Sequence, residues 1–219
     1  VTRLQWLLLV LYLLTFGWIA LAATSSIAGL FFGHPKAGAA KGAQPRGKTA
    51  LLMPVYNEDP AATCAALLAM AESLIARQQQ HWFEIFIISD STDPDVWVKE
   101  TAAVDLLRER LQGRMAVWYR RRYLNTARKA GNVQDFVTRW GARYDYMIVL
   151  DADSLIAADT LTFMVGEMDA DPGCGILQTL PRLYAGKTLF ARLQQFAGTL
   201  YGPVVAHGMT DWQGDDGNY

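Results

Sequence analysis

Apolar segments of strand length alternate with segments of helix length between residues 50 and 179 of this sequence. The strand-like runs recur at spacings of about 30 residues, which is the length of a βαβ unit. Crossovers in such units are nearly always right-handed and build a parallel sheet with helices on both faces. The pattern therefore predicts an α/β fold with a mainly parallel sheet. We expect strands at 50–55, 83–89, 115–119 and 175–179 and one that ends at 151, with helices at 61–77, 96–110, 132–140 and 159–169.

Polar residues follow these predicted strands at the edge of the sheet where α/β proteins bind their ligands. The first strand leads into PVYNED at 54–59, and the second leads into SDSTD at 89–93. A basic loop, RRRYLNTARK at 120–129, follows the third strand, and DAD at 151–153 follows the fourth. Four strand ends that carry such residues predict one shared ligand site.

Asp151 and Asp153 are separated by one small residue at the end of an apolar run. Residues i and i+2 of a strand point to the same side, so both carboxylates would face one ligand. Mg²⁺ and Mn²⁺ take oxygen ligands, and one or two carboxylates often hold them together with phosphate oxygens. The pair therefore indicates a divalent-metal site for a diphosphate. A loop that caps the next helix is the alternative, because Asp and Ser are good N-cap residues.

The other acidic residues at the strand ends have two interpretations. Asp59, Asp93 and Asp95 flank prolines at predicted helix starts, and capping explains them as well as ligand binding does. Asp90 directly follows the apolar run at 86–88, where a carboxylate can accept hydrogen bonds from a base or a ribose. We therefore expect Asp90 to contact a ligand.

The basic loop lies beside the predicted start of a helix, and helix N-termini bind anions through free N–H groups and the helix dipole. A solvated basic loop is the alternative. The formal net charge is −1, so the composition gives no reason to expect nucleic acid as a partner. Phosphate is the ligand group that this loop favours.

The N-terminal segment indicates a lipid bilayer as a further partner. Residues 4–33 contain no Asp, Glu, Lys or Arg, and about 20 apolar residues suffice to cross a bilayer as a helix. Basic residues without acids follow at 36–48, so the positive-inside rule places the C-terminal side in the cytoplasm. A secretory signal is the alternative, but its apolar core is usually about 7–15 residues long.

We therefore expect a transmembrane helix at 1–33, a juxtamembrane linker at 34–48 and a soluble domain at 49–219. Because the first residue is Val1 rather than Met, we also expect upstream sequence in the natural protein. The two cysteines are too few for a disulfide framework, which favours a reducing compartment.

The ordered set PVYNE, SD, KAGN and DAD resembles the nucleotide-sugar half of processive family 2 glycosyltransferases of the cellulose synthase type. Longer segments, including FEIFIISDSTDPDVW, YDYMIVLDADS and LFARLQQFAGTLYGP, are most similar to the bacterial inner-membrane glucosyltransferases of osmoregulated periplasmic glucan synthesis. The resemblance covers roughly 49–179. It implies a GT-A-like domain, with 49–219 as its donor-binding part.

The resemblance also implies roles for individual residues. Val55, Tyr56 and Glu58 would line the uracil pocket. Asp90 would bind the uridine part, and Lys129 would meet the diphosphate. Asp151 would contact the nucleotide, while Asp151 and Asp153 would be the metal ligands. The implied catalytic carboxylates are Asp90, Asp151 and Asp153.

By the same resemblance, the donor is UDP-glucose with Mg²⁺ or Mn²⁺, the acceptor is a glucan, and the family inverts the anomeric centre to give a β linkage. The family's general base is an Asp in a Thr-Glu-Asp-like motif, and no such motif follows residue 179. The Gln-x-x-Arg-Trp acceptor motif is absent too. We do not assign the base to Asp211, Asp215 or Asp216, so we expect the base downstream of this sequence.

Other functions remain open at this stage. Synthases of cellulose, hyaluronan or mannan share these donor motifs, and a membrane-anchored nucleotide-sugar sensor without activity would share them as well. A phosphotransferase with Asp151 as nucleophile is a third alternative. The segment 188–205 has apolar residues at helical spacing, which predicts an amphipathic helix either at the membrane surface or packed on the domain.

Overall fold

The computed structural model describes residues 2–31 and 45–213, except for the side chains of residue 207 and residues 209–213. Two compact units form: one runs from Gly38 to Gly173, and the other combines Val1–Ala37 with Cys174–Tyr219. The expected soluble domain at 49–219 therefore divides at Gly173, and its last part groups with the N-terminal helix. Most of the expected linker at 34–48 lies outside the described residues.

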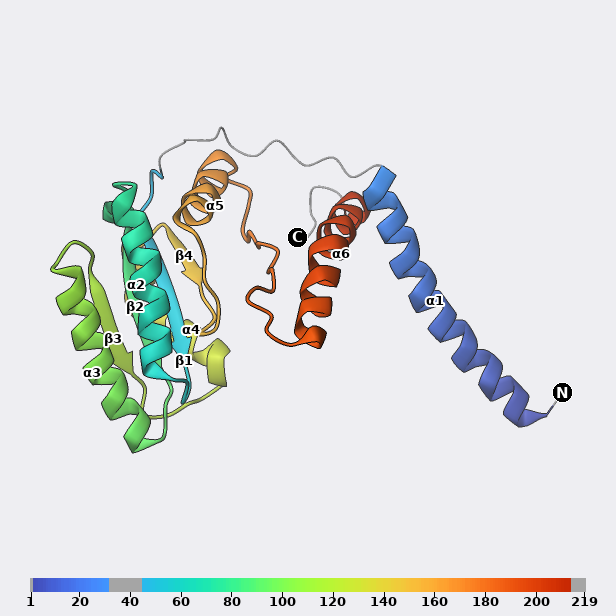
Figure 1. Ribbon diagram of the computed structural model, residues 1–219, viewed down its shortest axis with the longest axis horizontal. Helices are drawn as coiled ribbons and strands as arrows, with labels where there is room; N and C mark the ends of the chain where they lie inside the picture. The colour runs from blue at the N-terminus through green and yellow to red at the C-terminus, as the bar shows by residue number, and fades with distance from the viewer. Residues whose placement is uncertain (1, 32–44, 214–219) are drawn as a thin grey trace. The chain divides into compact units, whose positions relative to one another are not determined.

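In the described part of the unit from Gly38 to Gly173, four parallel strands form one sheet in the order β3-β2-β1-β4 (Figure 1). Thr49 pairs with Phe83 on one side and with Tyr146 on the other. The α/β class with a parallel sheet, as the sequence predicts, is confirmed. The strands are β1 (Thr49–Val55), β2 (Phe83–Ser89), β3 (Val117–Arg121) and β4 (Tyr146–Val149).

Helices alternate with these strands along the chain, as βαβ units require. Aspartate side chains cap two of them, because Asp59 accepts a hydrogen bond from the N–H of Ala61 and Asp93 accepts one from the N–H of Asp95. The helices of this unit are α2 (Pro60–Ala76), α3 (Pro94–Leu111), α4 (Arg128–Trp140) and α5 (Ala158–Ala170), with short 3₁₀ turns at Gln80–Trp82 and Gly141–Arg143.

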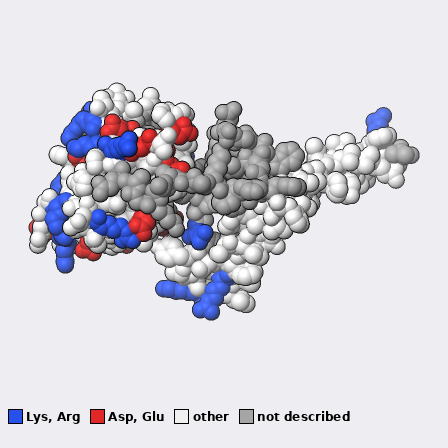
Figure 2. All heavy atoms as spheres, turned by 90° about the horizontal axis from the view of Figure 1, so that it is seen from above, with Lys and Arg blue, Asp and Glu red and all other residues white. Residues whose placement is uncertain are grey.

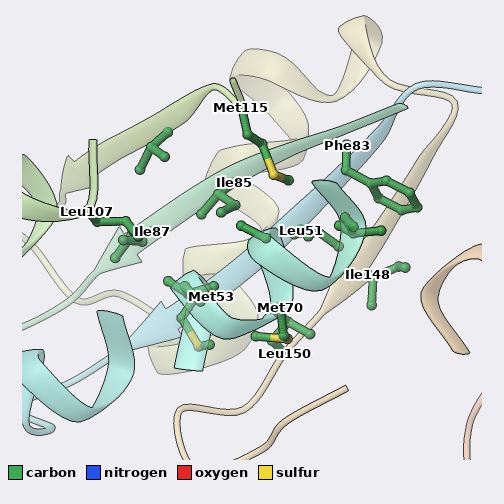
Figure 3. Packing of buried hydrophobic residues seen from close by; sticks show 14 of the residues in the cluster. Leu51, Met53, Met70, Phe83, Ile85, Ile87, Leu107, Met115, Ile148 and Leu150 are labelled. Atoms are coloured by element: carbon green, nitrogen blue, oxygen red, sulfur yellow. The ribbon is translucent and has the colours of Figure 1, made fainter. Parts of the chain in front are cut away.

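The two faces of the sheet carry different cores because successive side chains of a strand alternate between faces. One face packs against α2, α3 and α5, and Figure 3 shows side chains of Leu51, Ile85 and Met70 in this core. The other face packs against α4, where Phe136 meets Phe86 with ring centroids 4.9 Å apart. Helices therefore cover both faces of the sheet.

Hydrogen bonds to three acidic side chains fix the start of β1. Asp145 accepts one from the N–H of Lys48 at 2.8 Å, and Asp169 accepts one from the N–H of Arg46 at 2.9 Å. Glu84 accepts three, from Nζ of Lys48 at 2.7 Å, from Nε1 of Trp118 at 2.9 Å and from the hydroxyl of Tyr144 at 2.6 Å. These contacts lie at the end of the sheet opposite to the strand ends that carry the predicted site.

The structure corrects several predicted boundaries. The third strand lies at Val117–Arg121 rather than at 115–119, so that Val117 pairs with Ile85 of the neighbouring strand. Helix α4 begins at Arg128 rather than near Asn132, and β4 ends at Val149 before the aspartates. The predicted strand at 175–179 was wrong: these residues have no strand partner in the described part of the chain, and Ile176 is 84% exposed.

In the other unit, α1 (Arg3–Phe31) packs against α6 (Leu189–Gln213) through glycines. A Cβ atom on Gly29 would lie 1.9 Å from the carbonyl oxygen of Val204, and one on Gly208 would lie 1.8 Å from that of Ser25. The two backbones therefore touch, and neither position has room for a larger residue. Small residues permit this approach between helices in membranes.

Helix α1 is long enough and apolar enough to cross a bilayer, and no other described helix is. Figure 2 shows it as a white stretch with charged atoms only at its N-terminal end. Helix α6 exposes apolar side chains along its first half: Leu189, Phe190, Leu193, Phe196, Leu200 and Tyr201. The predicted helix at 188–205 is thus confirmed and extends further than expected.

Candidate functional site

A cavity of about 600 Å³ opens where β1, β2 and β4 end and α4 begins. This is the edge at which α/β sheets bind ligands. The cavity is large enough for a drug-sized ligand or a nucleotide. Its lining residues are Pro54, Val55, Tyr56, Glu58, Asp90, Asn125, Arg128, Lys129, Asn132, Asp151 and Ala152.

The loop after β1 is folded against the loop after β2. Asn57 has a left-handed backbone with φ of 57°, and its side-chain oxygen accepts hydrogen bonds from the N–H groups of Thr92 and Asp93. Its own N–H donates to Oγ of Ser91 at 2.8 Å. The carboxylate of Glu58 accepts a hydrogen bond from the N–H of Tyr56. This loop therefore holds Tyr56 and Glu58 at the cavity.

The buried carboxylate of Glu100, on α3, connects the loop after β2 to β3. It accepts hydrogen bonds from the hydroxyl of Ser91 in that loop and, at 2.9 Å, from the hydroxyl of Tyr119 in β3. Burial raises the pKa of Tyr119 to about 12, and the carboxylate of Glu100 raises it as well. Tyr119 therefore stays a neutral donor at physiological pH. Burial of Cys64 likewise raises the pKa of its thiol to about 11. The thiol is therefore protonated and unreactive at neutral pH, and Cys64 serves as a packing residue.

Asp90 is almost fully buried at the end of β2 and forms an ion pair with Arg122. Nε and Nη2 of Arg122 donate to the two carboxylate oxygens of Asp90 at 2.8 and 2.7 Å. The hydrogen bond to Asp90 raises the pKa of Arg122 above its usual value. Bidentate pairs of this kind are specific in geometry as well as strong.

Helix α4 is anchored to the sheet by a second arginine. The side chain of Asn132 is buried, donates to the carbonyl oxygen of Ile88 at 3.0 Å and accepts from Nη1 of Arg120 at 2.7 Å. Nη2 of Arg120 lies 2.8 Å from a carboxylate oxygen of Asp135. The first turns of α4 are therefore fixed at the end of β2.

Lys129 and Asp151 face each other at the cavity, where Nζ of Lys129 contacts a carboxylate oxygen of Asp151. The lysine side chain is 54% exposed and the aspartate side chain 64% exposed. Both groups are therefore open to a ligand from solvent. The sequence-predicted residues Asp90, Lys129 and Asp151 thus line one cavity together with Val55, Tyr56 and Glu58.

Asp153 is exposed and lies outside the lining of this cavity. Because β4 ends at Val149, the two aspartates lie in a turn, in which the N–H of Ser154 donates to the carbonyl oxygen of Asp151 at 3.0 Å. The expected same-side strand geometry therefore does not apply to them. No group of three or more His, Cys, Asp or Glu side chains is arranged for a metal ion within the described residues. The role of Asp153 as a metal ligand stays a prediction.

Sequence reasoning missed four residues of this site. Asn125 and Arg128 line the cavity, Asn132 lines it from the second turn of α4, and Arg122 neutralises Asp90. For Arg122, Asn125 and Arg128 the signal was the basic loop at 120–129 as a whole, and for Asn132 it was the KAGN motif at 129–132, to which only Lys129 contributed an assigned role. Capping, the alternative interpretation for Asp59 and Asp93, is confirmed.

A family model, described as glycosyl transferase family 2, matches residues 50–211. The chain belongs to glycosyl transferase family 2. Proteins named glucans biosynthesis glucosyltransferase H from Shewanella sp. (strain ANA-3) and Shewanella oneidensis are 46% identical to it over 221 aligned residues and the whole chain. The chain spans 30% of the length of these relatives.

A solved structure shares the fold of this family 2 chain. It is a mannosyltransferase from Pyrobaculum calidifontis in complex with GDP-Man and Mn²⁺, with a TM-score of 0.54 and 21% sequence identity. The alignment covers 75% of this chain and 43% of that one. The predicted glycosyltransferase fold is thereby confirmed.

Proposed function

We propose that this family 2 chain is the donor-binding part of a membrane-bound, inverting glucosyltransferase. The enzyme uses UDP-glucose and a divalent metal ion to extend the β-glucan backbone of an osmoregulated periplasmic glucan. One observation carries the proposal: Asp90, Lys129 and Asp151 converge on a single cavity at the strand ends. The 46% identity to proteins named glucans biosynthesis glucosyltransferase H supports glucose as the sugar.

In this proposal, the nucleoside occupies the β1 side of the cavity. The uracil ring packs against Val55 and Tyr56, and Glu58 orders the loop through its bond to the N–H of Tyr56. Asp90 lies behind the ring, at the end of β2, where it defines the polar wall for the uridine part. The cavity therefore contains both the apolar groups and the polar groups that are needed to orient a base.

The diphosphate occupies the α4 side of the cavity. Lys129 is one residue into α4, and a helix N-terminus attracts anions through its dipole. Displacing UDP from the anomeric carbon increases the negative charge on the leaving diphosphate. Charge that is fixed in place before the reaction stabilises this change without reorganisation. Lys129 and the first turn of α4 supply it here.

The oxygen donors of the site fit a divalent cation of the Mg²⁺ or Mn²⁺ class. The carboxylates of Asp151 and Asp153 are both exposed, and such cations need only one or two carboxylates when phosphate oxygens and water complete the set. In the proposal these two residues hold the ion. When bound, it would neutralise charge on the diphosphate leaving group. The mannosyltransferase structure with Mn²⁺ supports this choice of cation.

The glucan acceptor must lose a hydroxyl proton to a general base, and we assign no residue of the described chain to that step. Asp215 and Asp216 lie outside the described residues, and the side chain of Asp211 does too. The residues placed in the cavity account for donor binding and for the departure of UDP. They do not account for acceptor activation.

The proposed location is the bacterial inner membrane, with the cavity on the cytoplasmic side. Helix α1 has the length and composition of a membrane span, and the basic residues of 36–48 follow it in the sequence. UDP-glucose is a cytoplasmic metabolite, so a donor site on the cytoplasmic side is consistent with this orientation. The exposed apolar side chains of α6 support contact of that helix with the membrane surface.

The experiment that tests the function is a product assay. Membranes that contain the full-length protein are incubated with labelled UDP-glucose or other labelled UDP-sugars in the presence of Mg²⁺, and the polymer is identified by specific glycosidases. We expect incorporation from UDP-glucose into a β-glucan. Incorporation of another sugar would overturn the donor assignment, and binding without any polymer would indicate a sensor.

A further inference from the structure

The ion pair between Asp90 and Arg122 is the best-shielded one at the site. The side chains are 5% and 13% exposed, whereas those of Lys129 and Asp151 are more than half exposed. A buried pair contributes little net stability, but removing one partner leaves an unpaired buried charge, which is strongly unfavourable. The pair therefore persists whether or not a ligand is present.

Arg122, the first residue after β3, also binds the loop in which it lies. Its Nη1 donates to the carbonyl oxygen of Thr126 at 2.9 Å, and its Nη2 donates to that of Arg128 at 3.1 Å. The side-chain amide of Asn125 donates to the carbonyl oxygen of Asp90. One guanidinium thus joins the end of β2 to the turn that begins α4.

This turn has an unfavourable backbone that requires such support. Ala127 and Arg128 both have left-handed conformations, with φ of 57° and 50°, although neither is glycine. A left-handed conformation costs a non-glycine residue about 1–2 kcal/mol. The backbone of the turn also lies in close contact with α4, because a Cβ atom on Gly131 would lie 2.0 Å from the carbonyl oxygen of Thr126. Contacts from elsewhere must hold the turn, and Arg122 supplies them.

Lys129 follows this turn directly, so the turn fixes the backbone position from which its side chain reaches Asp151 and the cavity. We propose that Arg122 is a positioning residue of the donor site: by tying Asp90 to the carbonyl groups of the turn, it sets Lys129 and the first turn of α4 against the diphosphate. This inference rests on the proposed function. It adds a residue that touches neither the nucleotide nor the metal ion.

Two observations indicate that Arg122 positions other residues of the site and does not bind the ligand itself. The guanidinium of Arg122 has hydrogen bonds from all three of its nitrogens, and the residue is not among those that line the cavity. Its charge is compensated by Asp90, whose buried carboxylate would otherwise be unpaired at the wall of the cavity. Arg122 therefore shapes the site through Lys129 and Asp90.

The test compares Arg122→Lys with Arg121→Lys in the full chain, in detergent micelles with Mn²⁺. Both variants keep the positive charge, but a lysine cannot reproduce the fork that joins one carboxylate to two carbonyl groups. Arg121 is a matched control because its guanidinium stacks on Trp97, 4.8 Å from the ring centroid, and does not line the cavity. We expect UDP affinity to fall at least tenfold in Arg122→Lys and less than twofold in the control.

A double-mutant cycle identifies the route of the effect. In a Lys129→Ala background, Arg122→Lys should lower UDP affinity by a clearly smaller factor than in wild type, because one of the two groups that Arg122 positions is already absent. An equal loss in both backgrounds would overturn the proposal, since it would show general disruption of the site. Unchanged affinity in the single variant would overturn it as well.

A second readout does not depend on nucleotide binding. Loosening the turn should speed tryptic cleavage after Arg128 at least fivefold in Arg122→Lys compared with Arg121→Lys, as measured by peptide mapping. If the wild-type chain bound no UDP, the proposed function would be wrong. The cleavage rates would still show whether Arg122 holds the turn before α4. Equal cleavage rates in the two variants would overturn that role.

Discussion

The ammonium group of Lys129 contacts a carboxylate oxygen of Asp151 in the cavity that both residues line. Both side chains are more than half exposed, and exposed ion pairs contribute only about 0–1 kcal/mol to stability. The pair is therefore easily separated. A diphosphate would take the ammonium and a divalent cation would take the carboxylate, so both ligands would compete with the ion pair.

This relationship predicts that Lys129→Ala impairs binding but not folding. Hydrogen bonds to charged groups contribute about 1.5–3 kcal/mol, so UDP affinity should fall roughly 10- to 100-fold. The free energy of unfolding should change by less than about 0.5 kcal/mol, as for other exposed positions. Calorimetric titration with UDP and with uridine checks this, because the loss should be larger for UDP. An equal loss for both ligands would contradict contact with the diphosphate.

Gly131→Ala should disturb the start of α4. The added Cβ atom would lie 2.0 Å from the carbonyl oxygen of Thr126, so backbone must move. Overpacking of this kind costs about 1–3 kcal/mol, which urea unfolding followed by circular dichroism can measure. The control is Gly141→Ala at the other end of the helix, where the nearest atom is the flexible Cγ1 of Val137 at 3.3 Å. Similar unfolding midpoints for the two variants would contradict the tight turn.

Glu84→Gln should destabilise the sheet in a pH-dependent manner. Burial alone would raise the pKa of Glu84, but hydrogen bonds from Lys48, Tyr144 and Trp118 outweigh it and lower the pKa. An unfolded glutamate has a pKa of about 4.3, so the stabilisation is complete above that pH and is lost as the pH falls through the lower folded pKa.

We therefore expect Glu84→Gln to lose about 1–3 kcal/mol of unfolding free energy at pH 7, and the difference from wild type to shrink below about pH 4. Urea unfolding at a series of pH values measures it. Glu72→Gln, an exposed position on α2, should stay within about 0.5 kcal/mol. A difference that grew on acidification would have the wrong sign.

Gly29→Leu should break the packing of α1 on α6. Its side chain would meet the carbonyl oxygen of Val204, whereas a Cβ atom on Gly17 of the same helix meets nothing within 4 Å. SDS titration of the chain in mixed micelles, followed by the helical signal, should show earlier unfolding for Gly29→Leu than for Gly17→Leu. Coincident curves would argue against contact at Gly29.

The elements with continuous apolar runs could be predicted from sequence almost to the residue. The second strand, Phe83–Ser89, matched its prediction, because burial on both faces leaves the continuous apolar run 85–88 at its centre. The third strand was displaced because its end at an edge of the sheet carries Arg120 and Arg121, which a pattern of apolar residues does not capture. The start of α4 was missed because Gly131 and Asn132 have low helix propensity.

The sequence predicted which strand ends form the site, but it did not predict the contacts between the side chains there. Asp90, Lys129 and Asp151 were expected to share a cavity because parallel strands end at one edge. The ion pair between Asp90 and Arg122 joins the residues that directly follow two different strands, and sequence carries no signal for such a partner. Asp153 was expected beside Asp151 on the assumption of a longer strand, and the turn after Val149 removes that assumption.

The central claim is that this cavity binds a uridine diphosphate together with a metal ion held by Asp151 and Asp153. It is tested most directly by calorimetric titration of UDP into the chain with and without Mn²⁺, for wild type and for Asp153→Asn. We expect Mn²⁺ to strengthen binding at least tenfold in wild type and less than twofold in the variant, with unchanged circular dichroism spectra. Identical Mn²⁺-dependent curves for the two proteins, or no binding of UDP by wild type, would contradict the account.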